Sequence, residues 1–140
     1  MNFEYAAAPE SRSVVKIDPV YGHFINGKWV NGSAHFNTIN PATEEVLSSI
    51  SLGSAADVDA AVKAARSAFD KSWSKLSGRE RGKYLFRIAR IMQERAREFA
   101  VLETLDNGKP IRESRDVDVP LSAAHFFYHA GWADKLEYAG

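Results

Sequence analysis

The 140-residue sequence predicts an α+β segment in which a small antiparallel sheet is followed by three helices. Two observations predict it. Between residues 21 and 50, short runs of strand-forming residues alternate with turn residues, whereas from residue 54 onward apolar residues recur every three or four positions. A composition of 45% hydrophobic and 26% charged residues is that of a globular protein, which excludes wholesale disorder.

The strand region contains two pairs of short strands. Residues 24–25 and 28–30 flank Asn26-Gly27, a strong hairpin signal because a type I′ turn needs positive φ at both central residues. Residues 35–39 and 46–50 form the second pair, joined by the turn-forming residues 40–45. A sheet this small needs helices to cover one of its faces.

The first helix begins after Ser54, which forms a capping box with Asp57. Its apolar residues fall on one face at helical spacing: Val58, Ala61, Val62, Ala65 and Phe69. A second capping box, formed by Ser77 and Glu80, opens a longer helix over residues 77–106. We expect a break in that helix near residues 95–97.

The long helix ends at Asn107-Gly108, where glycine suits a left-handed C-cap, and Pro110 follows as a breaker. The third helix follows Pro120, a favoured first-turn residue. Its apolar and aromatic side chains include Phe127, Tyr128 and Trp132. Two interpretations of this aromatic helix remain open: it packs in the core, or it forms a surface for another domain or subunit.

Charge and targeting signals exclude several classes of protein. Lys and Arg total 18, as do Asp and Glu, so a general nucleic-acid binder is not expected. The basic residues between positions 79 and 97 are interleaved with Glu, as on a solvated helix face. Neither a secretory signal nor a membrane-spanning apolar run is present, which predicts a cytoplasmic protein without a membrane partner. Residues 1–20 are expected to form a flexible arm.

Candidate chemistry is sparse. The chain contains no Cys, which removes disulfides, thiolate metal sites and cysteine nucleophiles. No glycine-rich nucleotide-binding loop is present. His125 and His129 are four residues apart, the spacing of two zinc ligands, yet a third ligand is missing and packing is the favoured interpretation. The residues alone therefore predict a fold and no active site.

Four motifs occur in order along the sequence: residues 24–30 (FINGKWV), 40–43 (NPAT), 103–110 (ETLDNGKP) and 130–135 (AGWADK). Together they resemble the N-terminal part of NAD(P)-dependent aldehyde dehydrogenases, over residues 21–140. Glu44 departs from the family pattern, which usually has Gly in that turn. The resemblance implies the N-terminal portion of the cofactor-binding domain of an α/β fold, its strands and three helices packing on a dinucleotide-binding core that this segment lacks.

The resemblance implies an oxidoreductase that converts an aldehyde into a carboxylic acid. In such enzymes a cysteine thiolate attacks the carbonyl, hydride passes to NAD or NADP, and an activated water hydrolyses the thioester. The catalytic and cofactor-contacting residues of the family lie downstream of this segment, so it assigns no catalytic or cofactor-binding residue here. The segment alone is expected to be inactive and to bind neither cofactor tightly.

Two minor sites are implied by position. Family members often hold a monovalent cation near the N-terminal strands, which points to Thr38, Ile39 and Asp106; a helix-capping role for Asp106 is the rival interpretation. Val117 and Leu121 match positions that line the entrance to the substrate tunnel, with plain core packing as the alternative.

The complete enzyme is expected to be a cytoplasmic homo-oligomer, a dimer or tetramer, acting on an aldehyde substrate. A rival from another class is a non-catalytic interaction module derived from an aldehyde dehydrogenase N-terminus, which the aromatic third helix favours. The substrate and the choice between NAD and NADP depend on residues outside this sequence.

Overall fold

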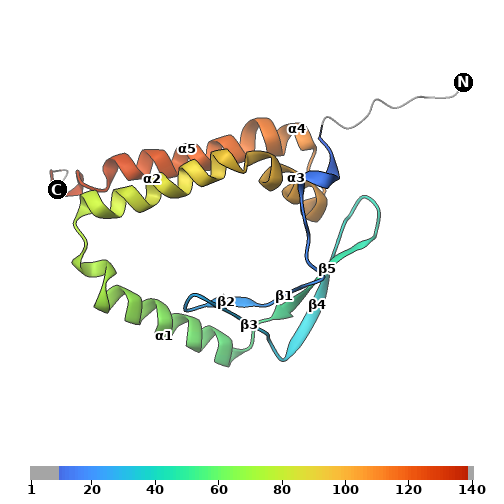
Figure 1. The fold of residues 1–140 in the computed structure, drawn as a ribbon, viewed down its shortest axis with the longest axis horizontal. Helices are drawn as coiled ribbons and strands as arrows, with labels where there is room; N and C mark the ends of the chain where they lie inside the picture. The colour runs from blue at the N-terminus through green and yellow to red at the C-terminus, as the bar shows by residue number, and fades with distance from the viewer. Residues whose placement is uncertain (1–9, 139–140) are drawn as a thin grey trace, which may run out of the picture.

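The computed structural model describes residues 10–138 and arranges them as a ring of helices and strands (Figure 1). The strands are β1 (Val20–Tyr21), β2 (His23–Ile25), β3 (Lys28–Val30), β4 (Ala34–Ile39) and β5 (Val46–Leu52). The α-helices are α1 (Ala55–Lys71), α2 (Gly78–Glu94), α3 (Ala96–Asn107), α4 (Ile111–Glu113) and α5 (Val119–Trp132). Shorter 3-10 helices are η1 (Arg12–Val14), η2 (Trp73–Lys75) and η4 (Leu136–Tyr138), and η3 (Ser114–Asp118) is a π-helix.

The two predicted strand pairs are confirmed. β2 and β3 form an antiparallel hairpin around Asn26 and Gly27, whose φ angles of 52° and 75° are those that a type I′ turn demands. β4 and β5 are also antiparallel, with a register shift between Thr38 and Ile39.

The expectation of one antiparallel sheet is wrong in its pairing. The hairpin β2–β3 is a separate sheet, and the other sheet has the order β1-β5-β4 with β1 parallel to β5. Val20 pairs with Ser49 and Tyr21 with Ile50. The sequence around β1 contains no signal for its pairing with β5, because the pattern of apolar residues in a strand indicates which face is buried and does not indicate which distant strand lies beside it.

Both predicted capping boxes are present. The Ser54 side chain accepts from the Asp57 amide and the Asp57 carboxylate accepts from the Ser54 amide, and Ser77 and Glu80 repeat the arrangement at the start of α2. α1 nevertheless buries none of its residues within this chain. Its apolar face is open, with Val58 and Val62 each about 60% exposed.

The predicted break in the long helix is confirmed at Arg95, whose φ of −109° and ψ of 20° separate α2 from α3. The predicted left-handed end is confirmed at Gly108, with φ 79°. The last helical run begins earlier than predicted, because α4 and η3 lead into α5 without a gap. Pro120 therefore lies in the first turn of α5 but not at the start of the continuous helix, which begins with α4. Proline has no N–H to donate, and Pro120 comes directly after the π-helix η3, where the backbone hydrogen-bond spacing changes.

The buried core lies where α2, α3 and α5 meet. α2 and α5 run antiparallel side by side (Figure 1), and at Gly82 an added Cβ would come within 2.9 Å of the Ala130 carbonyl oxygen. The buried apolar residues of the described chain are few, and half of them are alanines: Ala89, Ala100, Val101, Leu105, Val119 and Ala123. Among the described residues, the largest side chain that is fully buried is Ser114.

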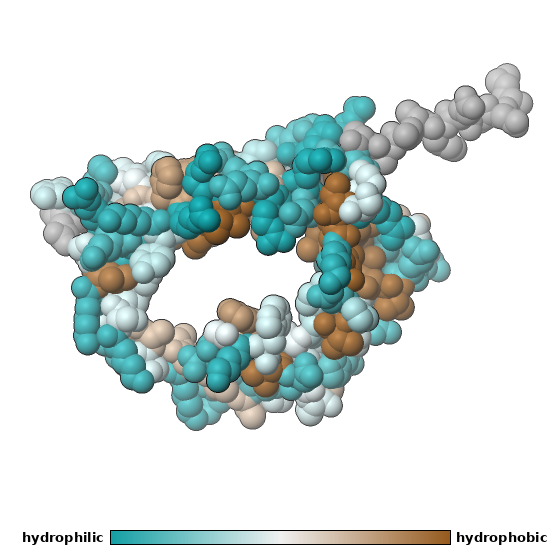
Figure 2. Space-filling model, in the orientation of Figure 1, coloured by the Kyte–Doolittle hydropathy of each residue, from teal (hydrophilic) through white to brown (hydrophobic). Residues whose placement is uncertain are grey.

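An opening passes through the molecule between the helical layer, defined as α2 to α5, and the strands with α1 (Figure 2). Large apolar side chains remain exposed on both sides of the fold, among them Phe36, Val62, Phe69, Ile88 and Phe99. These residues therefore build a frame rather than a closed core.

Residues 10–20, which the sequence assigned to a flexible arm, make specific contacts. η1 lies on α3, the Pro19 carbonyl accepts from the Ser49 amide, and Val20 begins β1. The Asp18 carbonyl also accepts from the Ser48 hydroxyl. The remainder of that predicted arm, residues 1–9, lies outside the described residues.

Candidate functional site

Thr38 and Asp106 are brought together across 68 positions of sequence. Thr38 lies near the end of β4 and Asp106 in the last turn of α3, and the Thr38 hydroxyl donates a hydrogen bond to the Asp106 carboxylate. The neighbouring Gly108 lies against the Pro41 ring, which follows β4. The end of α3 and the end of β4 thus form one corner of the ring.

The local backbone at this corner suits a cation. The register shift between Thr38 and Ile39 interrupts the β4–β5 ladder at two of the three residues predicted to hold the cation. Asp106 places a carboxylate at the C-terminal end of α3, where the helix dipole is negative and the last turn contains no basic residue. A bound cation would neutralise both the Asp106 carboxylate and the negative end of the α3 dipole. Hydroxyl, carbonyl and carboxylate oxygens are the hard ligands that alkali and other hard cations prefer.

The alternative role predicted for Asp106 was that of a helix cap, but the residue that caps α3 is Gly108. Gly108 closes α3, because its backbone N–H donates to the Thr104 carbonyl in the left-handed conformation. Ile39 stays 49% exposed beside this corner.

Val117 and Leu121 lie four residues apart on the last helical run. Val117 is in the π-helix η3 and Leu121 in the first half of α5, and their exposed fractions are 53% and 51%. Neither side chain belongs to the buried core of the described residues. Both side chains are therefore accessible on the surface of the described residues.

The π-helix that carries Val117 is fixed at both ends. Ser114 is fully buried and hydrogen-bonds to the Thr104 hydroxyl of α3 at 3.3 Å. At the other end Asp118 forms an ion pair with Lys109, and this hydrogen-bonded contact raises the pKa of Lys109. Single-turn π-helices occur frequently at functional sites, and this one sets the position of the exposed residues next to it.

A second feature is an apolar groove at the opposite end of the ring. It has a volume of about 540 Å³ where η2, α2 and the end of α5 meet. Tyr128 and Trp132 line it and are 62% and 40% exposed, while Phe127 packs edge-to-face on Phe86 with ring centroids 4.9 Å apart. Phe127 therefore packs between helices, whereas Tyr128 and Trp132 stay exposed within this chain, and the prediction of a partner surface remains open.

His125 and His129 do not acquire the third ligand that a zinc site needs. Both are exposed on α5, and His129 lines the apolar groove. Within residues 10–138 no group of three or more His, Asp or Glu side chains is arranged to hold a metal ion. Over the same residues, no helix has the length and apolarity to cross a bilayer.

Sequence reasoning missed three parts of this arrangement: the π-helix, the groove residues Trp73 and Leu136, and the pairing of Glu10 with Arg97. Pro110 followed by Ile111 was a usable signal for an earlier helix start, because proline favours the first turn. The other two depend on residues distant in sequence and had no local signal.

Comparison with known sequences agrees with the motifs. The sequence profile described as the aldehyde dehydrogenase family matches residues 29–139. Aldehyde dehydrogenase 1 of Tanacetum cinerariifolium is 47% identical over 116 residues, which cover 81% of this chain and 23% of that protein. Aldehyde dehydrogenase family 2 member B4, mitochondrial, of Arabidopsis thaliana is 44% identical over 115 residues, covering 80% and 21%.

Comparison with solved structures gives the same result for the fold. An aldehyde dehydrogenase of Bacillus cereus, solved in complex with NAD+, superposes with a TM-score of 0.83 at 39% identity and covers 86% of this chain but 25% of its own. The chain thus spans about a quarter of the length of these relatives. The predicted fold class, an N-terminal segment of this α/β fold, is confirmed. On the profile, the relatives and the superposition together, the chain belongs to the aldehyde dehydrogenase family.

Proposed function

We propose that these residues form the N-terminal part of an enzyme that oxidises an aldehyde to a carboxylic acid with NAD or NADP. In that enzyme they supply a scaffold, a packing surface for the cofactor-binding core and part of the wall of the substrate entrance. The supporting observation is the family match over residues 29–139, combined with relatives about four times as long.

The open frame supports a scaffolding role. α1 buries none of its residues, and exposed apolar side chains line both the helices and the strands. Burying such surface stabilises a protein by about 25 cal/mol per Å². The remaining three quarters of a family member would supply the surface that covers the frame.

We propose further that the 140-residue chain has no aldehyde oxidation activity of its own. The family reaction uses a cysteine thiolate as nucleophile, and this sequence contains no Cys. NAD or NADP would accept the hydride, and the sequence contains no glycine-rich loop that would bind this cofactor. The test is an assay of the purified chain with both cofactors and a panel of aldehydes. Absence of turnover is expected, and turnover by the pure chain would overturn this proposal.

A fusion protein tests the scaffold role itself. Residues 1–140 are joined to the remaining three quarters of the Tanacetum relative, aligned at the common boundary. We expect NAD(P)-dependent aldehyde oxidation from the fusion and none from that larger piece alone, which is the matched control. A folded fusion without activity would count against the assignment.

The cation site and the entrance wall complete the proposal. Thr38, Ile39 and Asp106 would hold a monovalent cation that neutralises the Asp106 carboxylate and joins β4 to α3. Val117 and Leu121 would form apolar wall at the substrate entrance, without taking part in the chemistry. The homo-oligomeric state, a dimer or tetramer, and the cytoplasmic location belong to the same proposal.

The apolar groove favours a second candidate function, a non-catalytic module that docks onto a full-length family member. Tyr128 and Trp132 present aromatic surface at this groove, as interface residues often do. Mixing the chain with a full-length relative on a sizing column distinguishes the two functions. Co-elution that is lost on Trp132→Ala supports docking, and separate elution at micromolar concentrations counts against it.

A further inference from the structure

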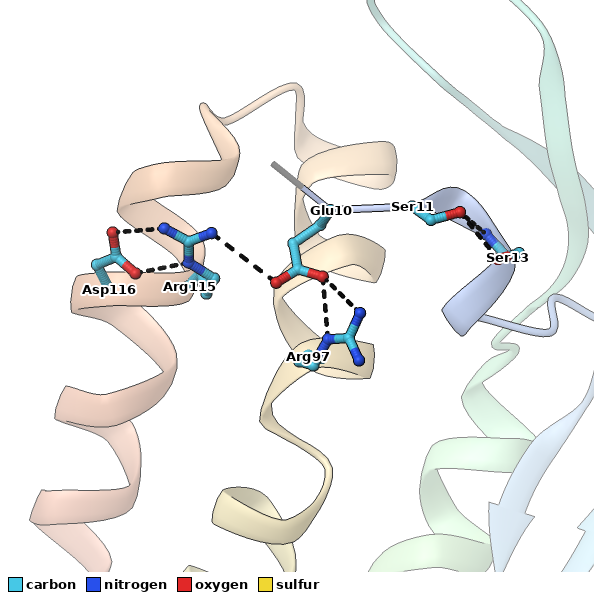
Figure 3. A network of polar contacts seen from close by, with 6 residues as sticks. All are labelled: Glu10, Ser11, Ser13, Arg97, Arg115 and Asp116. Atoms are coloured by element: carbon cyan, nitrogen blue, oxygen red, sulfur yellow. Dashed lines mark hydrogen bonds and ion pairs between the residues drawn. The ribbon is translucent and has the colours of Figure 1, made fainter. Parts of the chain in front are cut away.

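Glu10 is held between two arginines of the helical layer (Figure 3). Its carboxylate accepts a hydrogen bond from Arg97 Nε of α3 at 3.0 Å, lies 2.9 Å from Arg97 Nη2, and lies 3.8 Å from Arg115 of the π-helix. The Glu10 side chain is only 10% exposed. Arg115 in turn forms a two-bond contact with Asp116, and Asp116 together with Glu10 raises the pKa of Arg115. A carboxylate so placed is anchored more firmly than one in an ordinary surface ion pair.

The chain then runs from Glu10 to the strands. η1 follows on α3, capped by Ser11, and Val20 and Tyr21 then pair with β5 as β1. Arg12 lies 3.5 Å from Glu45, beyond the Asn40 turn, and adds a contact on the strand side. Residues 10–21 therefore contact the helical layer at one end and the sheet at the other.

We propose that residues 10–21 act as a strap that closes the ring by holding the helical layer against the sheet, with Glu10 as its anchoring residue. The covalent connection between the two layers runs through α1 and η2, on the other side of the opening (Figure 1). On the strap's own side, the corner formed by Thr38 and Asp106 is the neighbouring contact. Releasing the strap would therefore leave this corner as the remaining contact on that side, and the layers would move apart more readily about the α1 connection.

The first test removes the anchoring charge. Glu10→Gln removes both ion pairs with little change of size. Glu98→Gln is the matched control, because its ion pair with Arg95 at 2.6 Å is local and joins residues only three positions apart. Limited trypsin digestion reports release of the strap by cleavage after Lys16, which is exposed. We expect cleavage at Lys16 to become several-fold faster in Glu10→Gln and to stay unchanged in Glu98→Gln, since proteolysis follows the population of the open form. Equal rates in the two variants would overturn the proposal.

The second test measures the layers directly and stays informative if cleavage is slow. Because the chain has no Cys, Asn37→Cys on β4 and Gln93→Cys on α2 provide two unique sites for spin labels. In the labelled chain we expect a narrow distance distribution that broadens in Glu10→Gln and stays narrow in the control Glu98→Gln. A distribution unchanged by Glu10→Gln would show that the strap does not hold the layers.

Discussion

Gly108 carries two constraints at one position. Its φ of 79° is the left-handed conformation that closes α3, and an added Cβ would lie 2.7 Å from Pro41 Cγ. We therefore expect Gly108→Ala to lower the free energy of unfolding by about 1–2 kcal/mol or more, the cost of the left-handed backbone plus the contact. Urea unfolding followed by circular dichroism measures it.

Gly131 is the matched control for that substitution. It lies within α5 in open space, without a positive φ. Gly131→Ala should raise stability by about 0.5 kcal/mol, because alanine loses less backbone entropy in a helix. Equal effects of the two substitutions would contradict the C-cap argument.

At the same corner, Asp106 tests the cation proposal. If a monovalent cation neutralises its carboxylate at the end of α3, the unfolding midpoint should rise in KCl or NaCl relative to choline chloride at equal ionic strength. Asp106→Asn should abolish this difference. Asp70→Asn, which removes a carboxylate from exposed α1, should leave the difference intact. An ion-independent midpoint in the unsubstituted chain would argue against the site.

At the scale of elements, the two capping boxes make helix stability depend on pH. The Ser54 hydroxyl and then its amide lower the pKa of Asp57, and the Ser77 amide and then its hydroxyl lower that of Glu80. A lowered native pKa means that the unfolded chain binds more protons in this range. The stabilisation is therefore complete above the ordinary carboxyl pKa of about 4 and is lost as pH falls through the lowered values.

Circular dichroism between about pH 5 and pH 2 checks this dependence. The double variant Asp57→Asn with Glu80→Gln should lose less helix on acidification than the unsubstituted chain, and it should be the less stable of the two at neutral pH. Acid sensitivity identical to that of the unsubstituted chain would show that other carboxylates dominate.

The elements that sequence predicts well are those with their own local chemistry. Ser54, Ser77, Asn26-Gly27 and Gly108 each fix a boundary through a side chain or a φ value within four residues, so the structure agrees with them. The parallel pairing of β1 and the π-helix follow instead from contacts with distant segments. A periodic pattern of apolar residues cannot report such contacts.

The candidate site follows the same division. Nothing local in Thr38 or Asp106 predicts their hydrogen bond, which spans 68 residues, and only the family resemblance placed them together. Apolar periodicity correctly marked Val58 and Val62 as one face of α1, but not that the face stays uncovered within this chain. An amphipathic pattern specifies that a face is to be buried and does not specify what buries it.

For the whole molecule, the uncovered surface predicts self-association. We expect the isolated chain to bind the apolar dye ANS and to show a weight-average mass that rises with concentration in size exclusion with light scattering. The fusion described above should bind less dye per chain, since the added residues cover the frame. A strict monomer that binds no dye would contradict the open-frame description.

The strap precedes its helical partners in the sequence, and this separation sets an order of events during synthesis. Arg97 is synthesised 87 residues after its partner Glu10, a delay of roughly 4–17 s at about 5–20 residues per second. The hairpin, the β4–β5 pair and α1 are complete before that moment, because their contacts lie within residues 23–71. Ordering of residues 10–21 would therefore mark the point at which translation has passed α3 and the π-helix.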